Sequence, residues 1–247
     1  MPFIEEFYEN EDITHFRNYY EQSKRYAENI VRKHIENQKL KANIIRLSQV
    51  VGDNQSGVTK THYGIFDFIK KLQKFTTSYP NEAVRIQIDP IATQNMIPIN
   101  NAIDYLMGVL NKENLPVILN FVSKRPLKNN EIIDSVCSLL PLVIVPKKDL
   151  DKESMNKRER MIASGMSFTA VYAKTHLEFD TTNLEKMFSP NGNEISPESL
   201  HRMIEYFLKQ NLKKGRRKKY FPENSKASTI KYPTLITVSL LYWQCPE

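Results

Sequence analysis

The chain has 247 residues, of which 40% are hydrophobic and 26% charged, so it is long enough to bury a core and has the composition of neither a disordered nor a membrane protein. Its formal net charge is +7, from 35 Lys and Arg against 28 Asp and Glu. Residues 209–219 hold seven basic residues and no acidic one, so the excess positive charge is local. A local cluster of positive charge indicates a negatively charged binding partner.

The first half of the chain predicts helices and one strand. Apolar residues at steps of three and four predict a long amphipathic helix over residues 12–51, or two helices with a break near Asn37. The turn-forming residues 52–57 follow, and a second helix is predicted over residues 65–75. Residues 83–89 alternate between apolar and polar, which predicts a short strand.

The middle of the chain predicts short buried helices over residues 100–111 and 131–140. Between them, residues 115–126 fit a helix or a strand, because two prolines frame an apolar run. Residues 141–148 are interpreted as a connector between lobes. Residues 151–175 predict a helix whose second half is buried.

The last third predicts two more helices and an arm. A capping box, Thr182-x-x-Glu185, opens a short helix. Ser196 followed by Pro197 begins another helix, which runs into the basic residues and ends near Gly215. The chain closes on an apolar, β-branched segment after a polar linker, and such a segment is expected to dock on its own body or on a neighbour.

Together these elements predict a mainly α fold of two helical lobes, with short extended N- and C-terminal arms and little β-structure. We expect an N-terminal arm over residues 1–11, an N-terminal lobe over 12–128, a C-terminal lobe over 129–222, and a linker with the apolar arm over 223–247.

Motifs of catalysis and metal binding are missing from the sequence. It has seven glycines and no GxxxxGK[ST], GxGxxG, GxSxG or HExxH, and its five histidines are scattered. Cys137 lies in an apolar run, where a structural thiol is expected. We therefore predict a binding protein that is not an enzyme, with no cofactor and no metal.

Two cysteines argue against a disulfide framework and for a reducing compartment. The acidic N-terminus does not fit a signal peptide, and the apolar runs are too short to span a membrane. The expected location is the cytoplasm of a host cell or a virion, with the nucleus as an alternative.

Three groups of basic residues and two aromatic residues are the candidate nucleic-acid site, because cations bind phosphates and aromatic rings stack on bases. The group over residues 209–219 also fits a nuclear localisation signal or a solvated helix end. The candidate residues are Lys124, Arg125, Lys128, Lys147, Lys148, Lys157, Arg158, Arg160, Tyr172, Lys213, Lys214, Arg216, Arg217, Lys218, Lys219 and Tyr220.

Residues 141–175 resemble the C-terminal half of orthobunyavirus-type nucleoproteins. The run Pro141-Leu-Val-Ile-Val145 leads through the charged segment KKDLDKESMN into the helix that carries Arg158 and Arg160, and then into a Gly, small-residue and Thr-aromatic stretch. The chain lacks that family's Leu-Glu-Ala continuation and its tryptophan at the end of the stretch. The resemblance implies two helical lobes that clamp single-stranded RNA, with Arg158 and Arg160 as basic helix residues, and subunits joined by exchanged arms.

Our first hypothesis is a viral nucleoprotein, a sequence-tolerant single-stranded RNA-binding protein that forms a homo-oligomer along the genome in a ribonucleoprotein. The alternatives are a DNA-binding replication or regulatory protein, and a viral matrix or host-interaction protein with a nuclear signal. The residues expected to join subunits are Phe3, Ile4, Phe7, Leu235, Ile236, Leu240, Leu241 and Trp243.

Overall fold

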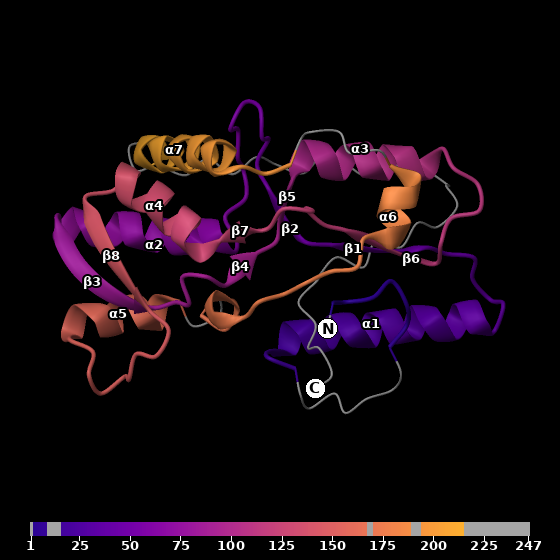
Figure 1. Cartoon of the computed structure of the whole chain (residues 1–247), viewed down its shortest axis with the longest axis horizontal. Helices are drawn as coiled ribbons and strands as arrows, with labels where there is room; N and C mark the ends of the chain where they lie inside the picture. Colours follow the sequence, from indigo (N-terminus) through magenta and orange to yellow (C-terminus); the bar gives the residue numbers. More distant parts are fainter. Residues whose placement is uncertain (1, 9–15, 167–169, 189–193, 215–247) are drawn as a thin grey trace.

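The computed structural model describes residues 2–8, 16–166, 170–188 and 194–214 (Figure 1). Helices and short strands alternate along the chain, which is the pattern of an α/β fold. In chain order the elements are α1 Tyr19–Glu36, β1 Ile44–Leu47, β2 Gln49–Val51, α2 Ile65–Ser78, β3 Glu82–Gln87, β4 Thr93–Gln94, β5 Met96–Pro98, α3 Ile99–Leu110, β6 Ile118–Phe121, β7 Leu127–Lys128, α4 Asn129–Leu139, β8 Leu142–Lys147, α5 Lys157–Gly165, the 3-10 turn η2 Tyr172–Lys174, α6 Thr182–Met187 and α7 Pro197–Lys214.

The strands pair mostly in parallel and over long separations in sequence. Strand β1 lies beside β6, with Ile44 opposite Ile118, and β2 lies beside β5. Strand β3 lies beside β8, with Glu82 opposite Leu142, whereas β4 and β7 are antiparallel. Parallel neighbours need crossover connections, which here contain helices.

The pair β1 and β6 is covered on both faces. On one face, Ile44 and Ile118 pack with Val31 of α1. On the other face, Ile45 and Leu119 pack with α3 and with Leu184 of α6. Both strands are buried at every position, as expected for parallel strands between helices (Figure 1).

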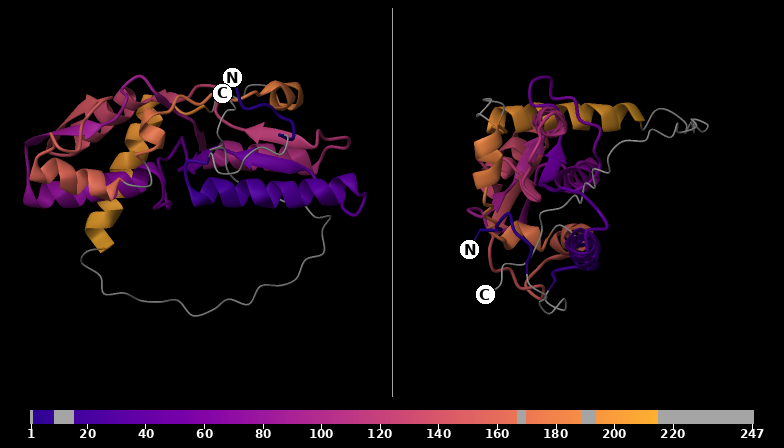
Figure 2. Two further views of the ribbon diagram at one scale, coloured as in Figure 1. Left: turned by 90° about the horizontal axis from the view of Figure 1, so that it is seen from below. Right: turned by 90° about the vertical axis from the view of Figure 1, so that its right-hand side faces the viewer.

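The largest core lies around α2, α4, α7 and the pair β3 and β8. The rings of Phe66 in α2 and Phe207 in α7 have centroids 5.1 Å apart, and both side chains are almost fully buried. Helix α5 packs on β3. The two views in Figure 2 place α7 on the side of the molecule away from α1.

A buried ion pair joins α1 to β1. Arg46 Nη2 lies 2.5 Å from Glu28 Oε1, and each side chain is only 1% exposed. The same guanidinium donates hydrogen bonds to the carbonyl oxygens of Ile4 and Glu6, so it also holds the N-terminal segment. Phe3 in that segment is buried and forms an isolated parallel β-bridge with Phe179.

The prediction of a mainly α fold with little β-structure is wrong. The predicted helix over residues 12–51 ends at Glu36, and its second part forms β1 and β2. The β-branched and aliphatic residues of β1 fill a pair of strands that is buried on both faces. The predicted connector over residues 141–148 contains β8. The predicted helix over 65–75 and strand over 83–89 are confirmed by α2 and β3. The lobe boundary at residues 128 and 129 stays a prediction, although β3 and β8 pair across it.

Candidate active site

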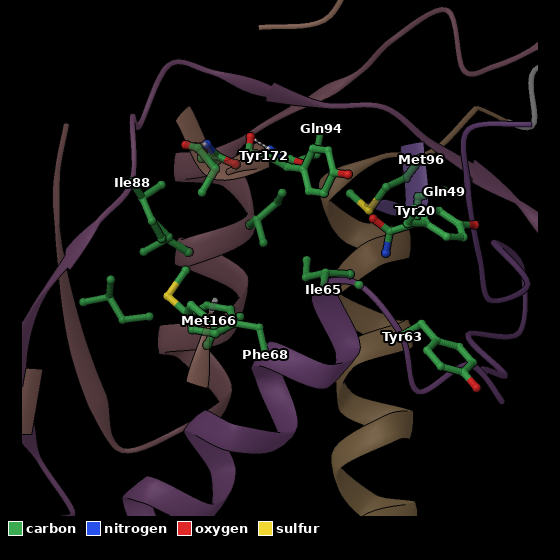
Figure 3. A pocket seen from close by; sticks show the side chains of 17 residues that line it. Tyr20, Gln49, Tyr63, Ile65, Phe68, Ile88, Gln94, Met96, Met166 and Tyr172 are labelled. Atoms are coloured by element: carbon green, nitrogen blue, oxygen red, sulfur yellow. Dashed lines mark hydrogen bonds between the residues drawn. The ribbon is translucent and has the colours of Figure 1, made fainter. Parts of the chain in front are cut away.

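A cavity of about 460 Å³ lies among α1, α2, α4 and η2, within the range of small-molecule pockets (Figure 3). Most of its wall is aliphatic, aromatic or thioether, and the residues that line it include no Lys, Arg, Asp or Glu. The apolar lining residues are Ile65, Phe68, Ile88, Met96, Ile132, Ile133, Val136, Ile144, Met166 and Ala173.

Tyr20 lies at the edge of this cavity, in the first turn of α1. The turn is fixed by Asn18, whose side chain accepts a hydrogen bond from the Glu21 N–H. Burial raises the pKa of Tyr20, so its hydroxyl is protonated at neutral pH. One turn later, Lys24 Nζ lies 5.4 Å from the centroid of the Tyr20 ring. The pair therefore places an O–H donor and a positive charge together at a cavity with no charged lining.

A buried network attaches the start of α1 to η2. Tyr172 donates a hydrogen bond from its hydroxyl to Glu21 Oε1 at 2.9 Å and accepts one from Asn18 Nδ2 at 2.6 Å. Arg17 lies over the Tyr172 ring and pairs with Glu21. Burial raises the pKa of both Tyr172 and Glu21, while Arg17 opposes the shift at Glu21. Because Tyr172 also lines the cavity, the network fixes the position of α1 beside it.

The predicted RNA-binding residues do not form one groove of unpaired cations in the described part of the chain. Lys124 pairs with Glu185, Arg125 with Glu131, Lys148 with Asp89 and Arg158 with Glu82, while Arg160 donates to the Met155 carbonyl. Lys128, Lys147 and Lys157 are exposed, and Tyr172 is 6% exposed. The side chains of Lys213 and Lys214, and the residues Arg216, Arg217, Lys218, Lys219 and Tyr220, lie outside the described residues.

The predicted N-terminal arm packs on its own chain. Phe3 is 2% exposed and its ring stacks on Phe179, with centroids 5.4 Å apart. Phe7 packs beside Val31, and Ile4 is 40% exposed. The arm residues Leu235, Ile236, Leu240, Leu241 and Trp243 lie outside the described residues, so their role in oligomerisation stays a prediction.

None of the described glycines provides an open backbone surface for a dinucleotide diphosphate, which is usually held by a glycine-rich turn at a helix N-terminus. Each one faces another part of the chain closely: Gly52 faces Val58 and Thr59, Gly57 faces Arg202, Gly64 faces Gln49, Gly108 faces Phe188, and Gly165 faces Lys71. The full sequence has no GxGxxG. The described glycines therefore form no open cradle for a diphosphate group.

The described residues form neither a metal-binding cluster nor a membrane-spanning helix. Within the ranges that the structure describes, no group of three or more His, Cys, Asp or Glu side chains could hold a metal ion. No helix in those ranges has both the length and the apolar composition needed to cross a membrane.

Comparisons with known proteins identify the architecture. The terminal R domain from the myxalamid PKS-NRPS biosynthetic pathway matches with a TM-score of 0.62 at 15% identity, over 86% of this chain and 55% of that one. A thiolation-reductase di-domain from an archaeal non-ribosomal peptide synthetase matches with a TM-score of 0.61 at 17% identity, over 86% and 44%. The fold is Rossmann-like.

Two further matches agree with this fold. The dTDP-glucose 4,6-dehydratase from Bacillus anthracis in complex with NAD matches with a TM-score of 0.55 at 12% identity, over 86% of this chain and 57% of that one. An NAD-binding family described as Male sterility protein matches residues 3–106. A search of curated protein sequences finds no match. The chain spans about half the length of these solved chains.

These matches overturn the nucleoprotein hypothesis. The resemblance over residues 141–175 is wrong, because that stretch holds β8 and α5 of a Rossmann-like fold. Single-stranded RNA as the partner, and a protein that is not an enzyme, are wrong as well, since the matched structures are enzymes. Nothing in the matches supports the duplex-DNA or viral matrix alternatives. The cytoplasmic, virion or nuclear location stays a prediction.

The sequence contains a signal for the candidate active site that motif searching missed. Tyr20 and Lys24 are four residues apart within the predicted first helix, so they share a face. Polar residues on a helix face usually contact solvent, and only the cavity beside Tyr20 distinguishes this pair. Gln49 lies in the same predicted helix, where its position gives no sign of a binding role. Tyr172 was predicted to stack on the bases of RNA and not to line a cavity.

Proposed function

We propose that these residues form the substrate-binding and proton-donating part of an NAD(P)-dependent reductase that acts on an uncharged carbonyl compound with an aliphatic chain. The observation that carries the proposal is an apolar cavity with a Tyr-Lys pair at its edge. The Rossmann-like fold, and the reductase names of two structures that share it, support the reaction class.

Proton transfer from Tyr20 is the step that this chain would perform. Reduction of a carbonyl group places negative charge on its oxygen, and an O–H group at that oxygen can neutralise the charge by donating its proton. The raised pKa of Tyr20 keeps its hydroxyl protonated at neutral pH. The ammonium of Lys24 stabilises the negative charge left on the Tyr20 ring after the transfer.

The wall of the cavity selects the substrate class. A sugar nucleotide, the substrate class in the name of the matched dehydratase, carries a charged diphosphate and many hydroxyls. Burying these groups against a wall with no charged residues costs free energy, because charges and polar groups lose hydration without gaining partners. An aliphatic chain gains about 0.8 kcal/mol for each buried CH₂ group. The cavity therefore favours an aliphatic carbonyl compound over a sugar nucleotide.

The described glycines do not fit the diphosphate of the dinucleotide, so the proposal rests on the cavity and the Tyr-Lys pair. The cavity and the proton donor can be tested without the dinucleotide.

The test uses the infrared carbonyl band of 2-decanone bound to the full chain. A hydrogen bond from Tyr20 lowers the C=O stretching frequency of the bound ketone. In Y20F we expect the band to return toward the frequency of a ketone without this bond, while Y19F, its 89% exposed neighbour, leaves the band unchanged. A Y20F band identical to that of the wild type would overturn the assignment of Tyr20 as the proton donor.

A further inference from the structure

We propose that Gln49 determines substrate specificity by binding a neutral hydrogen-bonding group of the substrate, an amide or a hydroxyl, and that a free carboxylate is rejected. The inference rests on the proposed function, because it names the group recognised in the same cavity. Gln49 begins β2, pairs with Met96 of β5 and lines the cavity, as does Tyr20 (Figure 3).

The other two side-chain amides of the cavity each donate to the backbone of the protein. Gln94 donates its Nε2 hydrogen to the Tyr172 carbonyl at 2.9 Å. Asn129 donates its Nδ2 hydrogens to the carbonyl oxygens of Asp89 and Ala173. The Tyr172 hydroxyl accepts a hydrogen bond from Asn18 and donates one to Glu21. Among the side-chain amides lining the cavity in the described part of the chain, Gln49 is the one that makes no hydrogen bond to the protein, so both its N–H donors and its carbonyl acceptor are available to a ligand.

The chemistry of Gln49 defines the group that it binds. A carboxamide offers an N–H donor and a carbonyl acceptor side by side, which complements another amide or a hydroxyl. The cavity lining includes no positive charge, so a carboxylate placed there would lose its hydration without an ion partner. The predicted ligand is therefore neutral and carries both a donor and an acceptor.

The backbone of Gly64 lies close to the Gln49 amide. Gly64 precedes α2 with φ of +58°, a backbone conformation that glycine adopts readily. A Cβ atom at this position would collide with Gln49 Nε2. The glycine thus leaves the space that the Gln49 amide occupies beside the backbone.

The test measures dissociation constants of the full chain for octanamide, octanoate and n-octane, which share a chain length and differ in polarity. In the wild type we expect octanamide to bind most tightly and octanoate least. Q49M and Q49L, which remove the amide, should weaken octanamide binding by about 3- to 10-fold, the effect of one net hydrogen bond, and leave n-octane binding unchanged. Q55L, at an exposed glutamine outside the cavity, is the matched control.

Each outcome separates the two proposals. If octanamide binds Q49M and Q49L as tightly as the wild type, the role of Gln49 is overturned, while binding of the aliphatic chain still supports the proposed function. If wild-type octanoate binding equals that of octanamide, selection for a neutral group is overturned. If none of the three probes binds to a wild-type chain that unfolds cooperatively, the cavity is not a substrate site and both proposals fail.

Discussion

Single residues in this protein connect elements that lie far apart in sequence. Tyr172 contacts the cavity with its ring and fixes the first turn of α1 through its hydroxyl, so one side chain links the wall of the site to its proposed proton donor. Its partners Asn18 and Glu21 flank Tyr20 within that turn. The position of the Tyr20 hydroxyl therefore depends on residues more than 150 positions away.

Glu159 makes the stability of the protein depend on pH in the acidic range. Its carboxylate accepts hydrogen bonds from Arg85 and from the Asn156 N–H, which lowers its pKa to about 2. A carboxyl whose pKa is lower in the folded state contributes stability above its ordinary pKa of 4.5, and this contribution is lost as pH falls toward 2. The pair also joins α5 to β3.

We expect E159Q to lower the free energy of unfolding by about 1.5–3 kcal/mol at pH 7, the contribution of a hydrogen bond to a charged group. The difference from the wild type should shrink between pH 4.5 and pH 2, because in this range the unfolded wild-type chain binds a proton at this carboxyl while the folded chain keeps it ionised. Urea unfolding at several pH values measures both effects. E153Q, at an exposed loop position, is the control. A difference that stays constant down to pH 2 would contradict this account.

At the scale of elements, the pair β1 and β6 with its covering helices forms the frame that holds α1 beside the cavity. Helix α1 packs on this pair through Val31 and is tied to β1 by the buried pair of Glu28 and Arg46. Removing one partner of such a pair leaves a buried charge without compensation.

We expect E28L to lower the free energy of unfolding by about 3–5 kcal/mol. The double variant E28L/R46L should lower the free energy of unfolding by less than E28L alone, although the carbonyl oxygens of Ile4 and Glu6 lose their hydrogen-bond donor. E36L removes the exposed partner of Arg32 in the same helix and should cost less than about 1 kcal/mol. Urea titration at neutral pH compares the three. An E28L variant within about 0.5 kcal/mol of the wild type would show that the pair does not hold α1 to β1.

Local sequence pattern predicted some of these elements and could not predict others. The helix α2 and the strand β3 have clear periods of their own, and both were predicted. Strand β1 was not, because Ile44, Ile45 and Leu47 also fit the stripe of the preceding helix. Its partner β6 lies 74 residues away, so the local sequence does not contain the pairing that completes the strand. Strand β8 was interpreted as a connector because prolines frame its apolar run.

At the scale of the whole molecule, the candidate site is a product of the tertiary fold. Its walls come from α1, α2, β2, β4, β5, α4, β8 and η2, which lie between residues 19 and 174. The sequence shows the Tyr20 and Lys24 spacing but not the cavity that gives it a role. The local excess of positive charge led to the RNA-binding hypothesis, because charge is visible in the sequence. A cavity appears only when distant elements pack together.

Four methionines allow a direct measurement of whether an aliphatic carbonyl compound occupies the cavity beside Tyr20. Met96 and Met166 line the cavity and are buried, whereas Met107 and Met161 do not line it and are about half exposed. Titration of 2-decanone into a chain with ¹³C-labelled methionine methyl groups should shift the Met96 and Met166 resonances together, in a saturable way, and leave Met107 and Met161 unchanged. Shifts at Met107 or Met161 without shifts at Met96 and Met166 would contradict the claim.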